Sequence, residues 1–244
     1  MTLADTTAIK FGQGQIGIYY LADTDQPAPF ALFLHGFPGS EKNHDLAYHL
    51  RAKGWHVLVL HFMGAWGSAG DYNPLNHPAE VRATLDYILS KHAPRPVDPS
   101  RIVVLGYSLG SRAALMAAAE DIRIQAVILA AGICDFSDLM LPDELFTSAA
   151  QFLTVSDSET LKRLYLRLGE GMQPTEALVK IAPRPVLLIH GTNDEIVPFF
   201  HLDGFGMFAG DNVQKVAIPG ADHLFALHRA ELIQAVSRFL EQHV

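Results

Sequence analysis

The feature that most restricts the fold of this chain is a short apolar segment that runs directly into the pattern Gly-x-Ser-x-Gly. Residues 101–105 are typical of a buried strand, residues 106–110 read Gly-Tyr-Ser-Leu-Gly, and residues 111–119 are rich in alanine, which favours a helix. A strand that turns this sharply into a helix holds its central residue in a strained backbone conformation, and the flanking glycines allow both elements to approach closely. The segment therefore predicts an α/β arrangement with Ser108 at the apex of a tight turn.

Strand-like and helix-like segments alternate along most of the chain. Continuous apolar runs predict strands that are buried on both faces, at 30–34, 56–62, 101–105, 124–131, 184–191 and 213–218. Apolar residues at helical spacing predict helices at 43–53, 78–92, 111–119 and 231–243, and an opening antiparallel hairpin is expected at 8–11 and 16–21. This alternation predicts a single α/β domain over residues 1–244, with a mostly parallel, twisted sheet and helices on both of its faces.

One region departs from the alternation. No strand is expected between about 132 and 182, where residues 143–155, 159–168 and 175–181 have short amphipathic helical patterns. A stretch of this length is too long for an ordinary connection, so we expect a helical cap insertion at about 133–182 that lies over a pocket. Its apolar residues would line the pocket or form the cap's own core: Phe136, Leu139, Met140, Leu141, Phe146 and Phe152.

Composition narrows the classes of partner. With 49% hydrophobic and 18% charged residues the chain can bury a substantial core, and its formal net charge of −8 argues against a nucleic-acid partner. A single cysteine, Cys134, cannot form an internal disulfide and is expected to be buried and inert. Residues 1–7 lack the pattern of a secretory signal, and the apolar runs are too short to cross a bilayer. We therefore expect a cytoplasmic protein with no membrane span.

A serine hydroxyl is a poor nucleophile at neutral pH, so a site built on Ser108 needs an orienting acid and a general base. Asp194 follows the predicted strand 184–191, at the sheet edge where such folds place their ligands. Glu195 competes with it, but the shorter Asp194 side chain stays nearer the strand end, and Glu195 is expected to face solvent. His223 lies in the loop after the last predicted strand, which gives the order serine, acid, histidine.

The chemistry of acyl transfer assigns a role to each residue. His223 Nε2 would take the proton of the Ser108 hydroxyl and return it to the leaving group, while Asp194 would fix the imidazole tautomer. The negative oxygen that develops at the attacked carbonyl needs two donors already in place. We expect these to be the backbone N–H groups of Leu109, directly after the serine, and of Phe37, in the loop after strand 30–34.

Other groups that could suggest a nucleotide or metal site have structural explanations. Gly64, Gly67 and Gly70 lack the spacing and the following helix of a nucleotide-binding loop, so a tight loop beside the site is favoured. His35 and His190 end strands and are expected to support their loops by hydrogen bonds. No pair of histidines has zinc-site spacing, so neither a metal nor an organic cofactor is expected. Other histidines are expected in surface helices or loops: His44, His49, His77, His92, His201, His228 and His243.

Four motifs together resemble the α/β-hydrolase superfamily. They are Gly106-Tyr107-Ser108-Leu109-Gly110, His35-Gly36-Phe37, His190-Gly191-x-x-Asp194 and Gly220-x-Asp222-His223. Within the superfamily, the loop 64–70, the approach 97–102 and the mid-chain insertion are most similar to small cinnamoyl-esterase-like and prolyl-oligopeptidase-like (dienelactone-hydrolase-like) serine hydrolases. The resemblance implies hydrolysis of a carboxylic ester without metal or organic cofactor.

The leading hypothesis from the sequence is a serine carboxylesterase that acts on a small-molecule ester through an acyl-enzyme. A second hypothesis keeps the same residues but makes the bond an amide, as in a small peptidase or amidase. A third is a non-catalytic α/β-hydrolase scaffold whose pocket binds a ligand.

Overall fold

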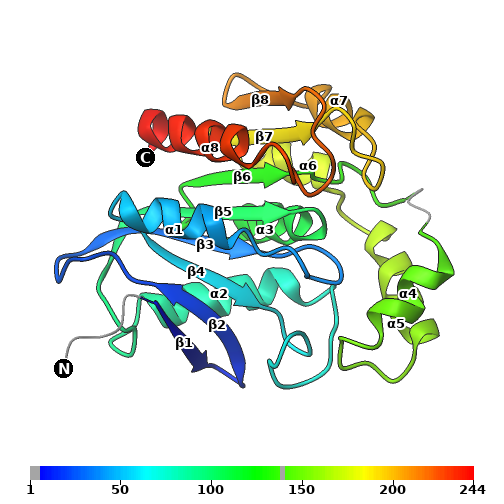
Figure 1. Ribbon diagram of the computed structural model, residues 1–244, viewed down its shortest axis with the longest axis horizontal. Helices are drawn as coiled ribbons and strands as arrows, with labels where there is room; N and C mark the ends of the chain where they lie inside the picture. The colour runs from blue at the N-terminus through cyan, green and yellow to red at the C-terminus, as the bar shows by residue number, and fades with distance from the viewer. Residues whose placement is uncertain (1–5, 138–140) are drawn as a thin grey trace.

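The computed structural model describes residues 6–137 and 141–244 (Figure 1). Residues 1–5 of the opening segment, which lacks the pattern of a secretory signal, and the candidate cap residues Leu139 and Met140 lie outside these ranges. Eight strands form one sheet in the order β1-β2-β4-β3-β5-β6-β7-β8. The strands are β1 Thr6–Phe11, β2 Gln15–Tyr20, β3 Ala28–Leu34, β4 His56–His61, β5 Val97–Tyr107, β6 Ala126–Ala130, β7 Val186–Gly191 and β8 Val213–Ile218.

The sheet of the described residues is antiparallel at the β1–β2 end and parallel elsewhere. Strand β1 pairs with β2, and β2 pairs with β4, in antiparallel fashion, whereas every pair from β4 to β8 is parallel. In the centre, Leu32 of β3 lies between Leu58 of β4 and Val104 of β5. The chain leaves β3 toward β4 and then crosses to β5, so the strand order reverses between β3 and β5, which is where such sheets place their ligands.

Helices cover both faces of the sheet. They are α1 His44–Ala52, α2 His77–Ile88, α3 Leu109–Glu120, α4 Asp143–Ala149, α5 Ser158–Leu166, α6 Pro174–Lys180, α7 Phe200–Gly206 and α8 Arg229–His243, with a 3-10 turn η1 at Arg167–Gly169. Side chains of α1 and α8 pack on one face, together with Phe33 and Leu105, and those of α2, α3, α6 and α7 pack on the other, with Leu32 and Val104. The alternation of neighbouring strand residues between two apolar clusters explains why the strands are apolar throughout.

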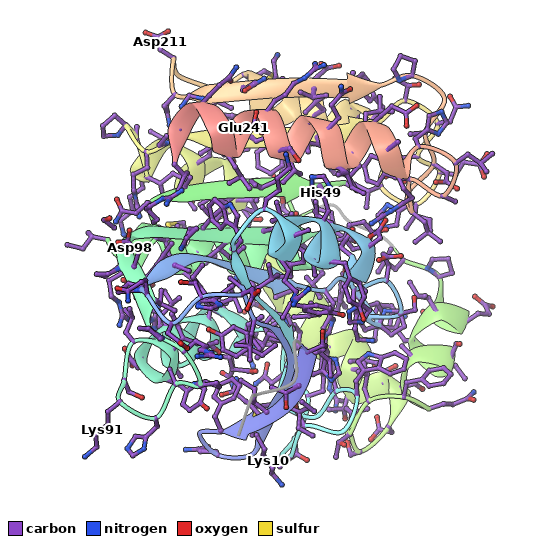
Figure 2. All side chains as sticks on the ribbon, turned by 60° about the vertical axis from the view of Figure 1, so that its left-hand side comes forward. Lys10, His49, Lys91, Asp98, Asp211 and Glu241 are labelled. Atoms are coloured by element: carbon purple, nitrogen blue, oxygen red, sulfur yellow. The ribbon has the colours of Figure 1, made fainter. Side chains whose placement is uncertain are left out.

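Polar and charged side chains lie around the outside of this layered core. Lys10, Lys91, Asp98 and Asp211 lie near the outline of the molecule, and His49 of α1 and Glu241 of α8 lie on the helical face (Figure 2). Within the described ranges, no helix is both long and apolar enough to cross a membrane.

Helices α4 and α5 stand apart from the two helical layers, beyond the carboxyl ends of the parallel strands (Figure 1). Their inner side chains form a third apolar cluster with the site loops, here called the α4–α5 cluster: Ala65, Tyr72, Leu109, Ile133, Phe136, Phe146, Ala149, Leu153, Leu161, Tyr165, Leu168 and Val197. Helix α6, the last helix of the predicted insertion 133–182, instead packs against α3 and contributes Ala177 and Leu178 to the sheet core. Of the predicted cap residues, Phe136 and Phe146 are buried in the cluster, whereas Phe152 is about half exposed.

The predicted fold class is confirmed, and each predicted strand and helix has a counterpart. The structure also differs from the predictions. Strand β5 begins at Val97, before the predicted strand 101–105, α4 ends at Ala149 and not at 155, and α7 was not predicted. His77 and His201, expected at the surface, are buried.

Candidate active site

The turn between β5 and α3 has the strained geometry that its sequence predicted. Ser108 has φ 53° and ψ −121°, a backbone conformation that residues other than glycine rarely adopt. Its backbone N–H donates a hydrogen bond to the Ala130 carbonyl over 2.9 Å. A Cβ atom at Gly106 would lie 2.4 Å from the Gly110 carbonyl oxygen, and one at Gly110 would lie 2.4 Å from the Leu34 carbonyl oxygen. Only glycine fits at either position, so these two residues allow the serine to stand at the end of the sheet.

The loop after β3 lies directly against this turn. A Cβ atom at Gly36 would lie 2.8 Å from Ser108 Cβ and 3.3 Å from Ser108 Oγ. The next residue, Phe37, and the residue after the serine, Leu109, are the two predicted oxyanion donors. Among the described residues, neither backbone N–H donates a hydrogen bond, so both donors are available to a ligand beside Ser108.

Asp194 is held by a tight turn just past β7. Its Oδ1 accepts hydrogen bonds from the backbone N–H of Ile196 at 3.0 Å and of Val197 at 2.8 Å. Its Oδ2 lies 2.8 Å from His223 Nδ1. The neighbouring carboxylate, Glu195, is exposed, as the sequence predicted.

A second histidine supports the same carboxylate. His190 Nε2 lies 2.8 Å from the Val197 carbonyl and 3.3 Å from Asp194 Oδ2, and because a carbonyl only accepts, this nitrogen carries a proton. Burial acts to raise the pKa of the Asp194 carboxyl, but the hydrogen bonds from His190 and His223 outweigh it and hold the pKa well below its ordinary value. Asp194 is therefore an ionised acceptor at neutral pH.

The ionised carboxylate sets the tautomer of His223. Because Asp194 can only accept, His223 Nδ1 donates to it, which leaves Nε2 as the acceptor nitrogen. The Tyr107 hydroxyl donates to the His223 carbonyl over 2.7 Å, and the two rings lie 5.3 Å apart, so the histidine loop is fixed to the residue before Ser108. The structure thus brings Asp194 and His223 into contact beside the serine turn. Among the hydrogen bonds of the described residues there is none between Ser108 Oγ and His223.

Helices α4 and α5 contact the loop that carries Phe37. The Phe37 ring lies 5.8 Å from the Phe146 ring of α4 and 5.3 Å from the Tyr165 ring of α5. Tyr72 completes this aromatic group, with its ring 6.4 Å from Phe37. The surroundings of the two candidate oxyanion donors are therefore apolar on the side of α4 and α5.

The glycine-rich loop after β4 pairs with the end of this segment. Backbone hydrogen bonds join Thr154 N to the Gly64 carbonyl at 2.7 Å and Tyr72 N to the Thr154 carbonyl at 2.8 Å. The Trp66 ring stacks on Phe152 with centroids 5.7 Å apart, and Lys42 Nζ lies 3.9 Å from the centre of the Trp66 ring. The loop is therefore built for close backbone packing beside the site.

The remaining predicted supports behave as expected. His35 Nδ1 donates to the Gly36 carbonyl at 2.8 Å and its Nε2 accepts from Phe62 N at 3.4 Å, so its ring is neutral and fixed. Burial lowers the pKa of His35 to about 3, in keeping with this role. Cys134 is buried with its Sγ 3.3 Å from His201 Nδ1, and burial raises the pKa of its thiol. No three His, Cys, Asp or Glu side chains of the described ranges are grouped so that they could hold a metal ion.

Two supporting contacts were not predicted. In the sequence Tyr107 was only the second residue of the Gly-x-Ser-x-Gly motif, although a buried tyrosine hydroxyl usually has a hydrogen-bond partner. His190 was expected to support its own loop, and the structure adds its contact with Asp194. The interval of four residues between them was visible, but only the turn that follows β7 brings the two side chains together.

The comparison with known families identifies the class of protein. A model of the family described as the alpha/beta hydrolase fold matches residues 32–170, more than half of the chain. The protein therefore belongs to the alpha/beta hydrolase fold family, and the predicted superfamily is confirmed.

Individual relatives are more distant. The chain is 25% identical over 207 residues to the uncharacterized protein YfhR of Salmonella typhimurium, an alignment that covers 80% of this chain and 64% of that protein. Est1E of Butyrivibrio proteoclasticus, solved with ferulic acid bound, has a TM-score of 0.73 at 25% identity and covers 94% of this chain and 96% of its own. A puromycin-hydrolyzing peptidase of Mycobacterium tuberculosis has a TM-score of 0.72 at 20% identity, covering 98% of this chain and 39% of its own.

Proposed function

We propose that the protein is a serine hydrolase that cleaves carboxylic esters through an acyl-enzyme. The observation that carries this proposal is the ionised Asp194 hydrogen-bonded to His223 Nδ1, at the same sheet edge as the strained Ser108 turn. A carboxylate that fixes one tautomer of a histidine beside a serine is the arrangement that activates a hydroxyl for attack on a carbonyl.

In the proposed reaction, Ser108 Oγ attacks the ester carbonyl while His223 Nε2 accepts the hydroxyl proton. Asp194 stabilises the positive charge on the imidazole and stays ionised. His223 then donates the proton to the departing alcohol, and a water molecule, deprotonated by the same nitrogen, releases the acid. The Ser108–His223 hydrogen bond would form as the substrate enters, since such contacts commonly tighten only in the complex.

The backbone N–H groups of Phe37 and Leu109 would stabilise the negative oxygen of the tetrahedral intermediate. Both donors lack an acceptor among the described residues and flank the serine. Preorganised donors of this kind contribute roughly 3–4 kcal/mol each to lowering the barrier. Because the Phe37 ring packs on Phe146 and Tyr165, α4 and α5 would act as a cap that roofs an apolar acyl pocket and excludes water.

The similarity to Est1E, which was solved with ferulic acid bound, supports ester hydrolysis, because ferulic acid is a carboxylic acid and such acids are products of ester hydrolysis. The similarity to the puromycin-hydrolyzing peptidase keeps an amide substrate open as the competing assignment. Hydrolysis rates of an aryl ester and its matched amide separate the two. The amide has the poorer leaving group, so a protein that turns over only the ester is an esterase.

Replacing Ser108 with alanine tests the proposal directly. We expect p-nitrophenyl ester hydrolysis to fall to the background rate, with an unchanged circular dichroism spectrum, because the nucleophile alone is removed. The matched control is Ser100→Ala, an exposed serine at the far end of β5, which should leave turnover unchanged. Turnover retained in Ser108→Ala would refute the assignment. A wild-type protein that a fluorophosphonate probe does not label at Ser108 would instead favour a non-catalytic scaffold.

A further inference from the structure

Arg112 is a largely buried cation without an ion-pair partner among the described residues. It lies in the first turns of α3, one helical turn after Ser108, and is only 9% exposed. Its Nε is fully buried without a hydrogen-bond partner, and its side chain makes no hydrogen bond or ion pair with any described residue. Burying a guanidinium without a partner costs several kcal/mol, so an arginine in this position calls for an explanation.

Two other partly buried arginines, Arg184 and Arg229, use their guanidinium groups within the fold. Arg184 donates from Nη1 to the carbonyls of Asp121 and Ile124 at 3.0 and 2.9 Å. Arg229 donates from Nε to Asp45 Oδ2 at 2.7 Å and from Nη2 to Asn43 Oδ1 at 2.9 Å. Arg95 also has a buried Nε without a partner, but its Nη1 pairs with Asp25. Arg112 differs from these three arginines because none of its side-chain nitrogens has a partner among the described residues.

Two more unpartnered polar atoms belong to His77, which lies within the electrostatic influence of Arg112, and to Tyr72, which contacts His77. His77 Nε2 and the Tyr72 hydroxyl are fully buried without hydrogen-bond partners, and both residues are 1% exposed. The two rings meet edge to face with centroids 5.2 Å apart. Burial lowers the pKa of His77 well below its ordinary value, and the positive charge of Arg112 lowers it further. The His77 imidazole is therefore neutral, and the positive charge of this group is that of Arg112.

Backbone position and packing connect these residues to the candidate active site. Leu109 and Arg112 are three residues apart on α3 and so share one face of the helix, and the Leu109 side chain belongs to the α4–α5 cluster. Tyr72 belongs to the same cluster, and its ring lies 6.4 Å from the Phe37 ring. Arg112 therefore follows one candidate oxyanion donor by one helical turn, and Tyr72 packs beside the other.

We propose that Arg112, together with the Tyr72 hydroxyl and His77 Nε2, forms an anion subsite that binds a carboxylate carried by the substrate. The inference rests on the proposed esterase function and assigns its substrate class, an ester whose acyl chain ends in a second carboxylate. A guanidinium offers two parallel donors that match a carboxylate, and a phenol adds a third. The four residues from Ser108 to Arg112 rise about 6 Å along the helix, so a few carbons separate the two acyl ends.

Binding of dicarboxylates to the inactive Ser108→Ala protein tests the subsite without any turnover. Adipate and hexanoate have the same chain length and differ only in the second carboxylate, so isothermal titration of both isolates its contribution. We expect adipate to bind at least about tenfold more tightly than hexanoate, the effect of one or two charge-assisted hydrogen bonds. Glutarate and suberate then show which chain length fits.

Arg112→Met in the Ser108→Ala background removes the charge and keeps a long side chain. We expect the preference for adipate to disappear and the melting temperature to stay constant or rise, because an unpaired buried charge has been removed. Arg163→Met, on the exposed face of α5, loses the same charge and should retain the preference. Equal binding of adipate and hexanoate, or a preference that survives Arg112→Met, would overturn the subsite.

Hydrolysis of esters of the same two acids tests whether the subsite contributes to turnover. In the otherwise wild-type protein, Arg112→Met should lower kcat/KM for mono-p-nitrophenyl adipate at least about tenfold and leave p-nitrophenyl hexanoate within about twofold. An Arg112-dependent adipate preference in a protein that hydrolyses no ester would overturn the esterase function and support the subsite. Ser108-dependent turnover with no adipate preference would uphold the esterase and overturn the subsite.

Discussion

Two buried carboxylates, Asp194 and Glu80, show how differently one protein treats the same chemical group. Asp194 accepts hydrogen bonds from two backbone N–H groups and from His223, with His190 Nε2 also within 3.3 Å. Glu80, in the first turn of α2, accepts only from Met63 N at 2.8 Å and from Gln15 Nε2 at 3.4 Å. Neither carboxylate has a Lys or Arg partner among the described residues.

The pKa values of the two groups move in opposite directions. For Asp194 the hydrogen bonds outweigh burial and the pKa is well below its ordinary value, whereas burial raises the pKa of Glu80 from 4.5 to about 7. The number of donors, and not the depth of burial, therefore decides whether a buried acid is charged at neutral pH. The fold places more hydrogen-bond donors around Asp194, at the proposed catalytic edge of the sheet, than around Glu80. Glu80, which contacts the loop after β4, is therefore partly protonated at neutral pH.

Among the variants that test the contrast between the two carboxylates, the largest predicted change in activity is at Asp194. Asp194→Asn keeps the size of the side chain but removes the ionised acceptor that fixes His223, so kcat for ester hydrolysis should fall by a factor of about 1,000–10,000. Steady-state kinetics with a p-nitrophenyl ester measures this. Glu195→Gln is the matched control, one residue away and exposed, and should leave kcat unchanged. A small loss in Asp194→Asn, similar to that in Glu80→Gln, would remove the distinction between the two acids.

The second effect concerns stability and pH at Glu80. Because its pKa is raised in the folded state, the stabilisation from the protonated form is fully present below pH 4.5 and is lost as the pH rises through about 7. The wild type should therefore lose up to about 3 kcal/mol relative to Glu80→Gln between pH 4.5 and 8. Asp194 acts with the opposite sign: its stabilisation is present above its unfolded pKa of 3.8 and is lost on acidification.

Urea unfolding of the wild type and of Glu80→Gln at pH 5, 6, 7 and 8 measures the Glu80 effect. The contributions of other titrating groups cancel in the difference between the two free energies of unfolding. Glu144→Gln, on the exposed side of α4, gives the same charge change without burial and should follow the wild type. Parallel pH profiles for wild type and Glu80→Gln would show that Glu80 is ionised in the fold, against the comparison drawn above.

The smallest predicted change in activity comes from removing one hydrogen-bond donor from Asp194, so that its surroundings become more like those of Glu80. His190→Leu removes one donor from the carboxylate, and we expect kcat to fall about tenfold with little change in KM, since His190 acts through Asp194. His190→Gln, whose amide can still donate, should recover part of the loss. An unchanged kcat in His190→Leu would mean that the backbone donors and His223 suffice to hold Asp194.

Much of the architecture could be predicted because local chemistry and global fold agree. The apolar runs at 30–34 and 184–191 can only be strands buried on both faces, and the glycines around Ser108 have no other use than a close-packed turn. The choice of Asp194 over Glu195 followed from side-chain length and agrees with the burial of the first and the exposure of the second.

Other features depended on neighbours that are distant in sequence. Helix α7 has seven residues with two glycines, a weak helical signal that packing of Leu202 and Phe205 on the sheet core overrides. His77 resembled a surface histidine beside Pro78, but its ring stacks on Phe62 of the preceding strand–loop segment with centroids 3.6 Å apart. Periodicity gives no information about such contacts.

The sequence by itself determined the order of strands and helices, the serine turn and the residues available for an acid and a base, because each of these follows from local steric and hydrophobic requirements. Only the tertiary structure decided which polar groups receive partners. Asp194 is surrounded by donors, whereas Arg112 meets no acceptor among the described residues, and that difference arises from the positions of loops that are far apart along the chain. Hydrogen bonding is short-ranged and directional, so it is fixed only when the fold has brought those loops together.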